Sequence, residues 1–366
     1  MIAMKTRTMR TCLTSTRSTA MSSARPMPSG TSSRCGDVAA DPQDNQQHPG
    51  DHDMVKKAAS KTAPATRRGG LTQSPHYDYV PIIDRPKLKL PGGARVAVIP
   101  YINIEHFPHD IPGTAIIPGT QRFNPDPLNY GWRDYGNRVG LWRMMELMDK
   151  IGMRGTVCLN SEIIREYPRI MDEAIKRRWA FIGHGINNAP ANFLSGIDGK
   201  KERAIIRGVL DAMEKRIGRK TKGWLSPFLT HTNNTPDILA ECGVEYLCDY
   251  TADDHPFPFN VRKGSLISVP YTVELNDIPA FQNVGISSAD FGDAIVDQFD
   301  VLYDEGADNA RCMPVCLHTF WVGQPNKFKH LKRAFAHIAS HDGVWFTTAD
   351  EVNDWYRKSY LRQART

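Results

Sequence analysis

The sequence predicts an α/β fold in which helices cover a mainly parallel sheet. From about residue 94, strand-like apolar runs alternate with amphipathic helical patterns, which is typical of strand–helix–strand units. Three of these runs end in an ionisable residue, namely Glu105, His184 and His318. With 366 residues, 40% of them apolar, the chain is long enough to bury a large core around such a sheet.

The expected elements follow from the period of the apolar residues. Alternating or continuous apolar runs predict strands, and a 3.6-residue period predicts helices. Ser161 is expected to cap one helix, and Gly152 and Gly218 are expected to end two others in the left-handed conformation. Strands are expected near 95–105, 154–159, 179–184, 222–226, 244–248, 265–271, 313–318 and 344–347, and helices over 138–151, 161–178, 200–217, 288–305 and 327–340.

Residues 1–75 are expected to form a disordered tail, followed by one catalytic domain over residues 76–366. The tail is rich in Ser, Thr and Arg and has few large apolar side chains, so it cannot bury enough surface to fold. It holds eleven Lys or Arg and five Asp or Glu, which accounts for the whole net charge of +6. Because the remainder is nearly neutral, no nucleic-acid partner is expected.

The composition of residues 1–34 is that of an organelle-targeting peptide, because this segment has six basic and no acidic residues. An alternative is that the product begins at Met54. The sequence has neither the apolar core of a secretory signal nor a run of about 18 apolar residues that would span a membrane. We therefore expect a cytoplasmic protein without a membrane partner.

The seven cysteines indicate no disulfide framework. They are scattered along the chain and include no C-x-x-C pair. Cys312 and Cys316 lie in a strand-like apolar run, where cysteine commonly serves as a small buried hydrophobic residue. We therefore expect neither a disulfide nor a cysteine zinc site.

The ionisable residues at the strand ends predict an active site, because the carboxyl ends of barrel strands meet at one mouth. We expect Glu105 to activate water as a general base, with a pKa raised by burial. His184 or His318 would donate a proton to the leaving group, and the two glycines beside His184 would let a ligand approach closely. Segment 106–137 has no sustained period, and we expect it to be a loop that covers this mouth.

Six short motifs follow one another along the chain: NIE (103–105), DYGNRVGLWR (134–143), GHG (183–185), GWLSP (223–227), VPYTVELND (269–277) and LHTFWVGQP (317–325). Their order resembles the polysaccharide deacetylase superfamily, also called the NodB-homology or carbohydrate esterase 4-like group. Within it, the chain is most similar to the branch of cofactor-independent allantoinases and cyclic imide hydrolases. The resemblance covers residues 80–358. It implies a distorted (β/α)7 barrel that hydrolyses a non-peptide C–N bond.

The chain departs from the deacetylase pattern at three positions. Glu105 is preceded by Ile104 where the family has a second acid, and Asn188 stands where it has the second histidine of a metal-binding pair. The family's Arg-x-Pro pattern reads LSP at 225–227. An open catalytic site needs about three protein ligands for its ion. We therefore expect no required cofactor, and at most a weakly bound zinc ion held by Glu105 and His184.

Further charged and polar residues are candidates for substrate binding, each with a structural alternative. Asp253 and Asp254 would form a paired-acid site or cap turns. Asn276 and Asp277 would contact the substrate or fix their own loop. Arg138 would bind a substrate carboxylate or carbonyl, although the apolar residues around it also suggest helix packing.

Other candidates would line the rim of the mouth. His231 and Asn188 are polar residues expected close to the strand ends. Trp224 and Trp321, together with Trp132, would form an aromatic wall for a flat ring, although core packing is the commoner use of tryptophan.

The expected function is therefore hydrolysis of a small cyclic amide, imide or ureide. The first alternative is a metal-dependent N-deacetylase that acts on an acetylated sugar or polysaccharide in an open groove. The second is a non-catalytic binder that kept the barrel after losing ligands. The substrate would be a small molecule or a sugar, and association into a homo-oligomer is compatible with each reading.

Overall fold

The computed structural model of the chain describes residues 73–111 and 115–361. The predictions for the tail, its targeting segment and Met54 therefore concern residues that lie almost wholly outside the described range. Among residues 73–111 and 115–361, no helix is both long enough and apolar enough to cross a membrane.

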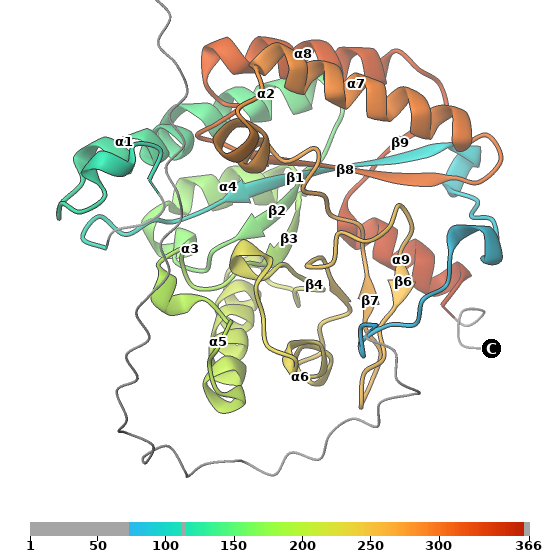
Figure 1. Ribbon diagram of the computed structural model, residues 1–366, viewed down its shortest axis with the longest axis horizontal. Coiled ribbons are helices and arrows are strands. Elements are labelled where there is room, and N and C mark those ends of the chain that lie inside the picture. The colour runs from blue at the N-terminus through green and yellow to red at the C-terminus, as the bar shows by residue number, and fades with distance from the viewer. Residues whose placement is uncertain (1–72, 112–114, 362–366) are drawn as a thin grey trace, which may run out of the picture. The chain divides into compact units, whose positions relative to one another are not determined.

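The described residues build one sheet that is curled toward a barrel (Figure 1). Seven parallel strands follow in the order β7, β5, β4, β3, β2, β1, β8, with β6 antiparallel beside β7 and β9 paired with the start of β1. Asn276 forms a parallel bridge with Cys316, which joins the segment after β7 to β8. The expected NodB-like barrel is confirmed. The strands are β1 Val96–Ile104, β2 Thr156–Leu159, β3 Ala180–Gly183, β4 Gly223–Trp224, β5 Tyr246–Leu247, β6 Phe257–Pro258, β7 Ile267–Ser268, β8 Arg311–His318 and β9 Val344–Phe346.

The helices form a layer around this sheet (Figure 1). All eight expected strands are present, whereas strand β6 and helices α1, α6 and α9 were not predicted. The helices are α1 Pro127–Tyr135, α2 Leu141–Ile151, α3 Ile163–Glu166, α4 Pro168–Lys176, α5 Gly199–Ile217, α6 Thr235–Glu241, α7 Ser288–Glu305, α8 Pro325–Ala339 and α9 Ala349–Ser359.

The prediction that all of segment 106–137 is a loop was wrong. Helix α1 begins at Pro127, and the Asp126 side chain accepts a hydrogen bond from a first-turn amide. A π-helical turn, Gly136–Gly140, then leads directly into α2. An Asp-Pro pair is a favoured helix start because proline has no amide hydrogen to leave unpaired at the first helical position.

The predicted helix 161–178 is two helices, α3 and α4. Pro168 starts α4, because its ring cannot donate the hydrogen bond that would continue α3 through this position. The prediction for Ser161 was also wrong, since α3 begins at Ile163 and has no side-chain cap. Gly152 and Gly218 do end α2 and α5 with φ angles of 78° and 79°.

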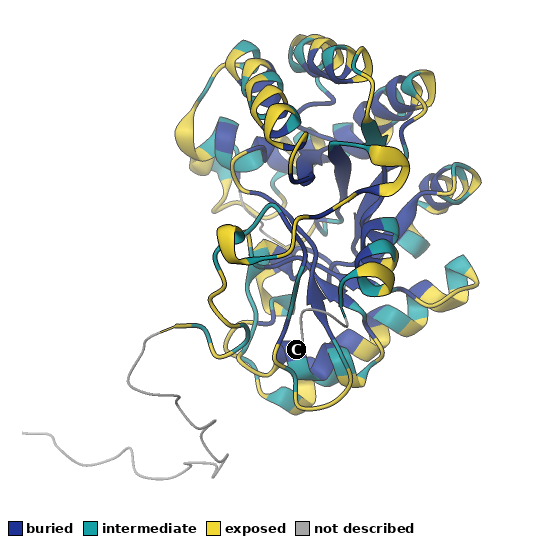
Figure 2. Ribbon diagram, turned by 90° about the vertical axis from the view of Figure 1, so that its right-hand side faces the viewer, coloured by how far each residue is buried: buried dark blue, intermediate teal, exposed yellow. Residues whose placement is uncertain are grey.

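Alternate residues of each strand face two different cores. On β1, Val96 and Val98 pack under the surrounding helices, whereas Ala97, Ile99 and Tyr101 face the interior of the barrel, where residues of α9 join them. Strand side chains alternate in this way because successive Cβ atoms point to opposite faces. Figure 2 shows the result: the central strands are buried, whereas the outer faces of the helices are exposed.

The junction of α1 and α2 packs closely against the turn that follows β8. A Cβ atom at Gly140 would collide with the main-chain oxygen of Thr319, and one at Gly136 would collide with the Thr319 hydroxyl and the Phe320 amide. These two glycines are one helical turn apart, so they place a single face of the helix against the turn. The main-chain atoms of Thr319 and Phe320 in this contact cannot move away as the end of a flexible side chain could.

We expect Gly140→Ala to lower the free energy of unfolding by about 2 kcal/mol, because the added methyl group overpacks this contact. Urea denaturation followed by circular dichroism measures the change. Gly131→Ala is the matched control, because a Cβ atom there meets nothing within 4 Å. The control should be neutral or stabilising by up to about 1 kcal/mol. Equal destabilisation by both substitutions would contradict the packing argument.

Candidate active site

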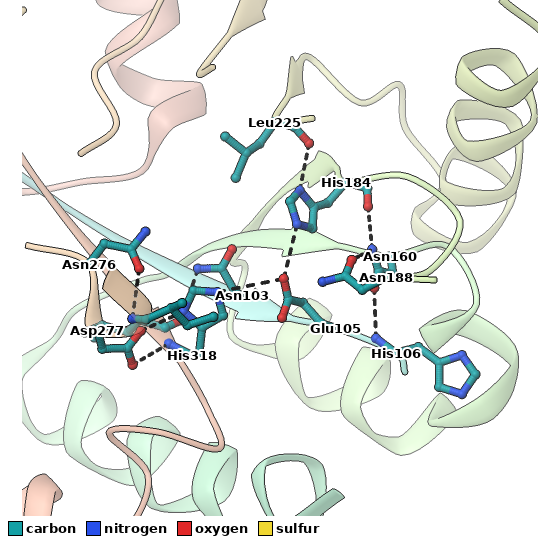
Figure 3. A network of polar contacts seen from close by, with 12 residues as sticks. Asn103, Glu105, His106, Asn160, His184, Asn188, Leu225, Asn276, Asp277 and His318 are labelled. Atoms are coloured by element: carbon teal, nitrogen blue, oxygen red, sulfur yellow. Dashed lines mark hydrogen bonds and ion pairs between the residues drawn. The ribbon is translucent and has the colours of Figure 1, made fainter. Parts of the chain in front are cut away.

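The side-chain alternation of the strands continues into the residues that follow them and points three ionisable groups inward. Glu105 continues the interior series 97, 99 and 101 of β1. His184 follows interior residue 182 of β3, and His318 follows interior residues 312 and 316 of β8. Because β1 lies between β8 and the β2–β3 pair, the three side chains meet at the carboxyl end of the sheet (Figure 3).

Glu105 is the centre of this group. Its Oε1 atom lies 3.3 Å from Nε2 of His184 and 3.8 Å from Nε2 of His318. Exposed fractions are 7% for Glu105, 3% for His184 and 5% for His318. Its other oxygen, Oε2, is buried and has no hydrogen-bond partner among the described residues. The carboxylate therefore keeps one free acceptor inside the site.

Each imidazole is oriented by a hydrogen bond on its far side. Nδ1 of His184 lies 2.7 Å from the main-chain oxygen of Leu225, which can only accept, so this nitrogen carries the hydrogen. Nδ1 of His318 lies 2.6 Å from a carboxylate oxygen of Asp277, whose second oxygen accepts from the His318 amide at 2.8 Å. Both rings consequently turn Nε2 toward Glu105.

The pKa values differ from the sequence-based expectation. Burial alone would raise the pKa of Glu105, but the charge of His318, the hydrogen bond and charge of His184 and the Asn188 amide outweigh it and lower that pKa. The prediction of a raised carboxyl pKa was therefore wrong. Burial alone would lower the pKa of His318, but the carboxylates of Asp277 and Glu105 raise it. The geometry thus favours an ionised carboxylate beside a protonated imidazole.

Asn160, at the end of β2, ties the neighbouring strand ends together. Its side-chain oxygen accepts from the His106 amide at 2.8 Å, and its side-chain nitrogen donates to the main-chain oxygen of His184. The same nitrogen donates to Oδ1 of Asn188 at 3.1 Å. A sequence signal for Asn160 exists, because it follows interior residue 158 at the same two-residue spacing as the catalytic candidates.

The donor set fits a weak metal site but not a tight one. Glu105 and His184 are adjacent donors, with Oε1 of the carboxylate 3.3 Å from Nε2 of the imidazole. Asn188 also adjoins Glu105, but its side-chain oxygen is engaged by Asn160. His318 lies on the other side of the carboxylate. Two adjacent donors fall short of the roughly three that hold a catalytic zinc ion.

Arg133 on α1 is a buried residue whose charge interacts with that of Glu105, and the sequence analysis did not single it out. Its side chain is buried, with the guanidinium carbon 3.9 Å from the centre of the Phe107 ring, and its Nε atom has no hydrogen-bond partner among the described residues. Burial lowers the pKa of Arg133 to about 10, and the negative charges of Glu105 and Asp126 oppose that shift. A buried cation without a paired carboxylate is unusual.

A sequence signal for Arg133 does exist. It lies three residues before Gly136 and seven before Gly140, so it shares the helix face that packs on the turn after β8. Arg138, the predicted binding residue, lies on the other face. Its side chain is 75% exposed and reaches Asp134 at 3.7 Å along the helix. The structure therefore does not bring Arg138 into the site.

The Asp253–Asp254 pair lies far from Glu105. The main-chain oxygen of Asp254 accepts from the amide of Cys312, at the amino end of β8, whereas Glu105 follows the carboxyl end of β1. Asp253 pairs with Arg85 at 2.6 Å and accepts from the His255 amide. These contacts favour the alternative that Asp253 and Asp254 cap turns rather than form a paired-acid site.

Asn276, Asp277 and His231 lie at the carboxyl edge but are engaged by the protein. The side-chain oxygen of Asn276 accepts from the Ile278 amide at 3.2 Å, which fixes its own loop. Asp277 is fully buried and holds His318. His231 lies 2.9 Å from a carboxylate oxygen of Asp249, the residue that also accepts from the Ser226 amide.

The predicted tryptophan wall is divided between two faces. Trp224 packs with the outer core, and its ring lies directly over Gly183, so it does not face Glu105. Trp321 instead belongs to a cluster with Phe107, Phe320 and Trp132 and has a buried Nε1 atom without a partner among the described residues.

The glycines beside His184 make room for protein atoms. A Cβ atom at Gly183 would collide with Trp224, and one at Gly185 would lie 2.7 Å from the Pro227 ring. Gly185 also has a φ of +70°, which side-chain-bearing residues rarely adopt. The expectation that these glycines admit a ligand was therefore wrong.

Comparison with known proteins agrees with this fold. The sequence pattern of the polysaccharide deacetylase family matches residues 132–247. A Schizosaccharomyces pombe protein assigned as a polysaccharide deacetylase is 27% identical over 243 residues, which cover 60% of this chain and 73% of that protein. The peptidoglycan deacetylase of Helicobacter pylori is 21% identical over 274 residues, covering 66% and 90%.

Solved structures share the same architecture. The crystal structure of PuuE allantoinase matches with a TM-score of 0.67 and 22% identity, over 78% of this chain and 99% of that one. A Pseudomonas aeruginosa protein described as a polysaccharide deacetylase matches with a TM-score of 0.67 and 22% identity, over 76% and 96%. At such identity these likenesses concern the fold. The segment that matches the polysaccharide deacetylase pattern, residues 132–247, lies within this shared fold.

Proposed function

We propose that this protein is a hydrolase of non-peptide C–N bonds and that its substrate is a small cyclic amide, imide or ureide. The observation that carries the proposal is the arrangement around Glu105: a buried carboxylate with one free oxygen, faced by two imidazoles that other groups hold in place. A base and an acid on either side of a reacting carbon are what hydrolysis of an amide bond requires.

The chemistry follows from these roles. Glu105 Oε2 takes a proton from water while the water oxygen bonds to a ring carbonyl carbon. The C–N bond then breaks, and the nitrogen takes the proton that His318 carries on Nε2. Asp277 holds His318 in the tautomer and orientation for this step, and its charge stabilises the imidazolium. His184 keeps the carboxylate in place through Oε1.

Arg133 is assigned to bind the carbonyl oxygen of the substrate. Its buried guanidinium has an unpaired nitrogen, and the Glu105 charge acts on it, so its positive charge lies in the same neighbourhood as the base. Negative charge develops on the carbonyl oxygen as water attacks, and a fixed cation in a dry site stabilises it.

A small ring suits the burial of the site. Glu105 is only 7% exposed, and the aromatic cluster of Phe107, Phe320 and Trp321 adjoins His318, whose ring centre lies 5.6 Å from that of Phe320. Flat apolar rings pack favourably on such side chains. An imide or ureide nitrogen also leaves with less electrophilic help than an amine, which suits a centre with few metal ligands.

A metal-dependent N-deacetylase of an acetylated sugar is the second candidate. It is supported by the family pattern over residues 132–247 and by the adjacent donor pair of Glu105 and His184. This alternative requires a divalent ion at that pair, and it therefore makes the opposite prediction about chelation.

The full-length protein should open cyclic imides or ureides in the presence of a strong chelator, and it should release no acetate from N-acetylated chito-oligosaccharides. Glu105→Gln should lower kcat by about 10²- to 10⁴-fold, because the base is removed while the shape is kept. Asp253→Asn is the matched control, since it removes a carboxylate at the far end of the sheet and should leave turnover unchanged. Chelator-sensitive acetate release would overturn the proposal in favour of the deacetylase.

Turnover should depend on the protonated form of His318 and therefore decline as pH rises through a pKa above 6.5. Asp277→Asn removes the carboxylate that raises this pKa, so the alkaline limb of kcat/KM should move to lower pH. The acid limb reports Glu105 and should stay below pH 4.5 in both proteins. An alkaline limb that does not move, in a variant with native circular dichroism, would show that His318 is not the acid.

Arg133→Met should lower kcat/KM by about 10- to 100-fold, the value of one hydrogen bond to a charged group. The same change should not lower the melting temperature, because it removes a buried cation without a close carboxylate partner. Arg138→Met removes an exposed arginine from the same helical segment and should change neither quantity. Loss of stability together with activity would indicate a structural role for Arg133.

A further inference from the structure

Three potential metal ligands meet on the outer helical layer, away from Glu105. Helices α7 and α8 lie side by side in Figure 1. Asp300 lies near the end of α7, His337 lies in the last turn of α8, and His341 follows α8 closely. One donor atom from each residue lies within 4.8 Å of the others. Two imidazoles and a carboxylate are a ligand set that zinc-like ions favour.

Asp300 and His337 are already in contact across the two helices. Nε2 of His337 lies 2.7 Å from Oδ1 of Asp300. A tetrahedral ion with ligand distances of about 2.0–2.2 Å needs donors slightly farther apart than this, so the pair must separate by a fraction of an ångström. Both side chains are at least one-third exposed, so the rearrangement displaces no core residue.

The ring of His341 is prepared for coordination. Its Nδ1 atom lies 2.9 Å from the main-chain oxygen of His337, which can only accept. The hydrogen therefore sits on Nδ1, and Nε2 has its lone pair free. Metal-binding histidines characteristically donate their second nitrogen to such an acceptor, which fixes the tautomer and the ring plane.

Aromatic side chains hold both imidazoles from the α7 side. The Phe299 ring lies 5.8 Å from that of His337 and 5.1 Å from that of His341. Tyr303 lies 5.2 Å from His341 and donates its hydroxyl hydrogen to the main-chain oxygen of Asp342. The histidines are thus fixed against the helix that carries the third ligand.

We propose that Asp300, His337 and His341 bind a divalent transition-metal ion such as Zn²⁺, with water in the fourth position. Binding replaces the direct contact between His337 and Asp300 with a bond from each residue to the ion. The bound ion joins the ends of α7 and α8. It stabilises the folded chain because the three ligands come together only there.

This site is separate from the candidate active site. His341 lies two residues before Gly343, whose main-chain oxygen accepts from the Arg95 amide directly before β1. Glu105 follows the other end of β1, so the whole length of that strand lies between the two centres. The inference goes beyond the proposed function, and its outcome does not depend on the substrate.

Zn²⁺ alone is the probe, added to the full-length protein in isothermal titration calorimetry and in thermal unfolding. His341→Phe is the main variant, because it keeps a ring against Phe299 and Tyr303 but has no ligand atom. Asp300→Asn is the second variant, because the Asp300 side chain is about half exposed and takes no part in the core. Asp293→Asn is the matched control, since Asp293 also lies on α7 and pairs with Arg333 of α8.

We expect saturable binding near one ion per chain, with a melting temperature that rises on addition of Zn²⁺ and returns with a chelator. His341→Phe and Asp300→Asn should each weaken binding by at least about tenfold and reduce the thermal shift. Asp293→Asn should retain both. Equal binding by the wild type and His341→Phe would overturn the proposal. So would binding that disappears only in Glu105→Gln, or binding at millimolar concentration without a thermal shift.

Discussion

The buried charge of Glu105 is the constraint on which the carboxyl end of this barrel depends. Removing a carboxylate from water costs several kcal/mol unless polar partners compensate. The compensation comes from the imidazoles of His184 and His318, and each ring is fixed by a further strand end or loop through Leu225 and Asp277. Segments spread over more than 200 residues of sequence must therefore converge within a few ångströms. If any one of these segments were displaced, the Glu105 carboxylate would lose a polar partner that compensates for its burial.

Much of this convergence could be predicted from the sequence, because strands have a strict period of two. The runs that end at Glu105, His184 and His318 place each residue on the same face as the small or apolar interior residues before it. The same period places Trp224 on the opposite face, so its assignment to an aromatic wall could have been avoided. The position of Arg133 could be predicted only from a different pattern. Gly136 and Gly140 are one helical turn apart and mark the packed face of the helix, and Arg133 lies on the same face.

Electrostatic detail could not be predicted in the same way. Burial of Glu105 follows from its position after an apolar strand, and burial by itself raises a carboxyl pKa. The groups that reverse the shift lie 79 and 213 positions along the chain and act only because the fold places them at Oε1. Likewise, nothing local to Asp253 indicates that Arg85 pairs with it. Sequence patterns locate a side chain on an element, whereas its pKa depends on neighbours from other elements.

In the proposed site only Glu105 and His184 are adjacent metal ligands, so the positive charge that the reaction needs must come largely from side chains. Attack on a carbonyl places negative charge on oxygen, and a centre that holds a metal weakly must stabilise it with its own cations. In the proposed mechanism these are His318, on β8, and Arg133, on α1. The segments that position these two residues are in contact. The junction of α1 and α2 packs against the turn after His318, where Gly136 and Gly140 lie close to Thr319. The tight helix packing and the placement of the two cations are therefore one structural requirement.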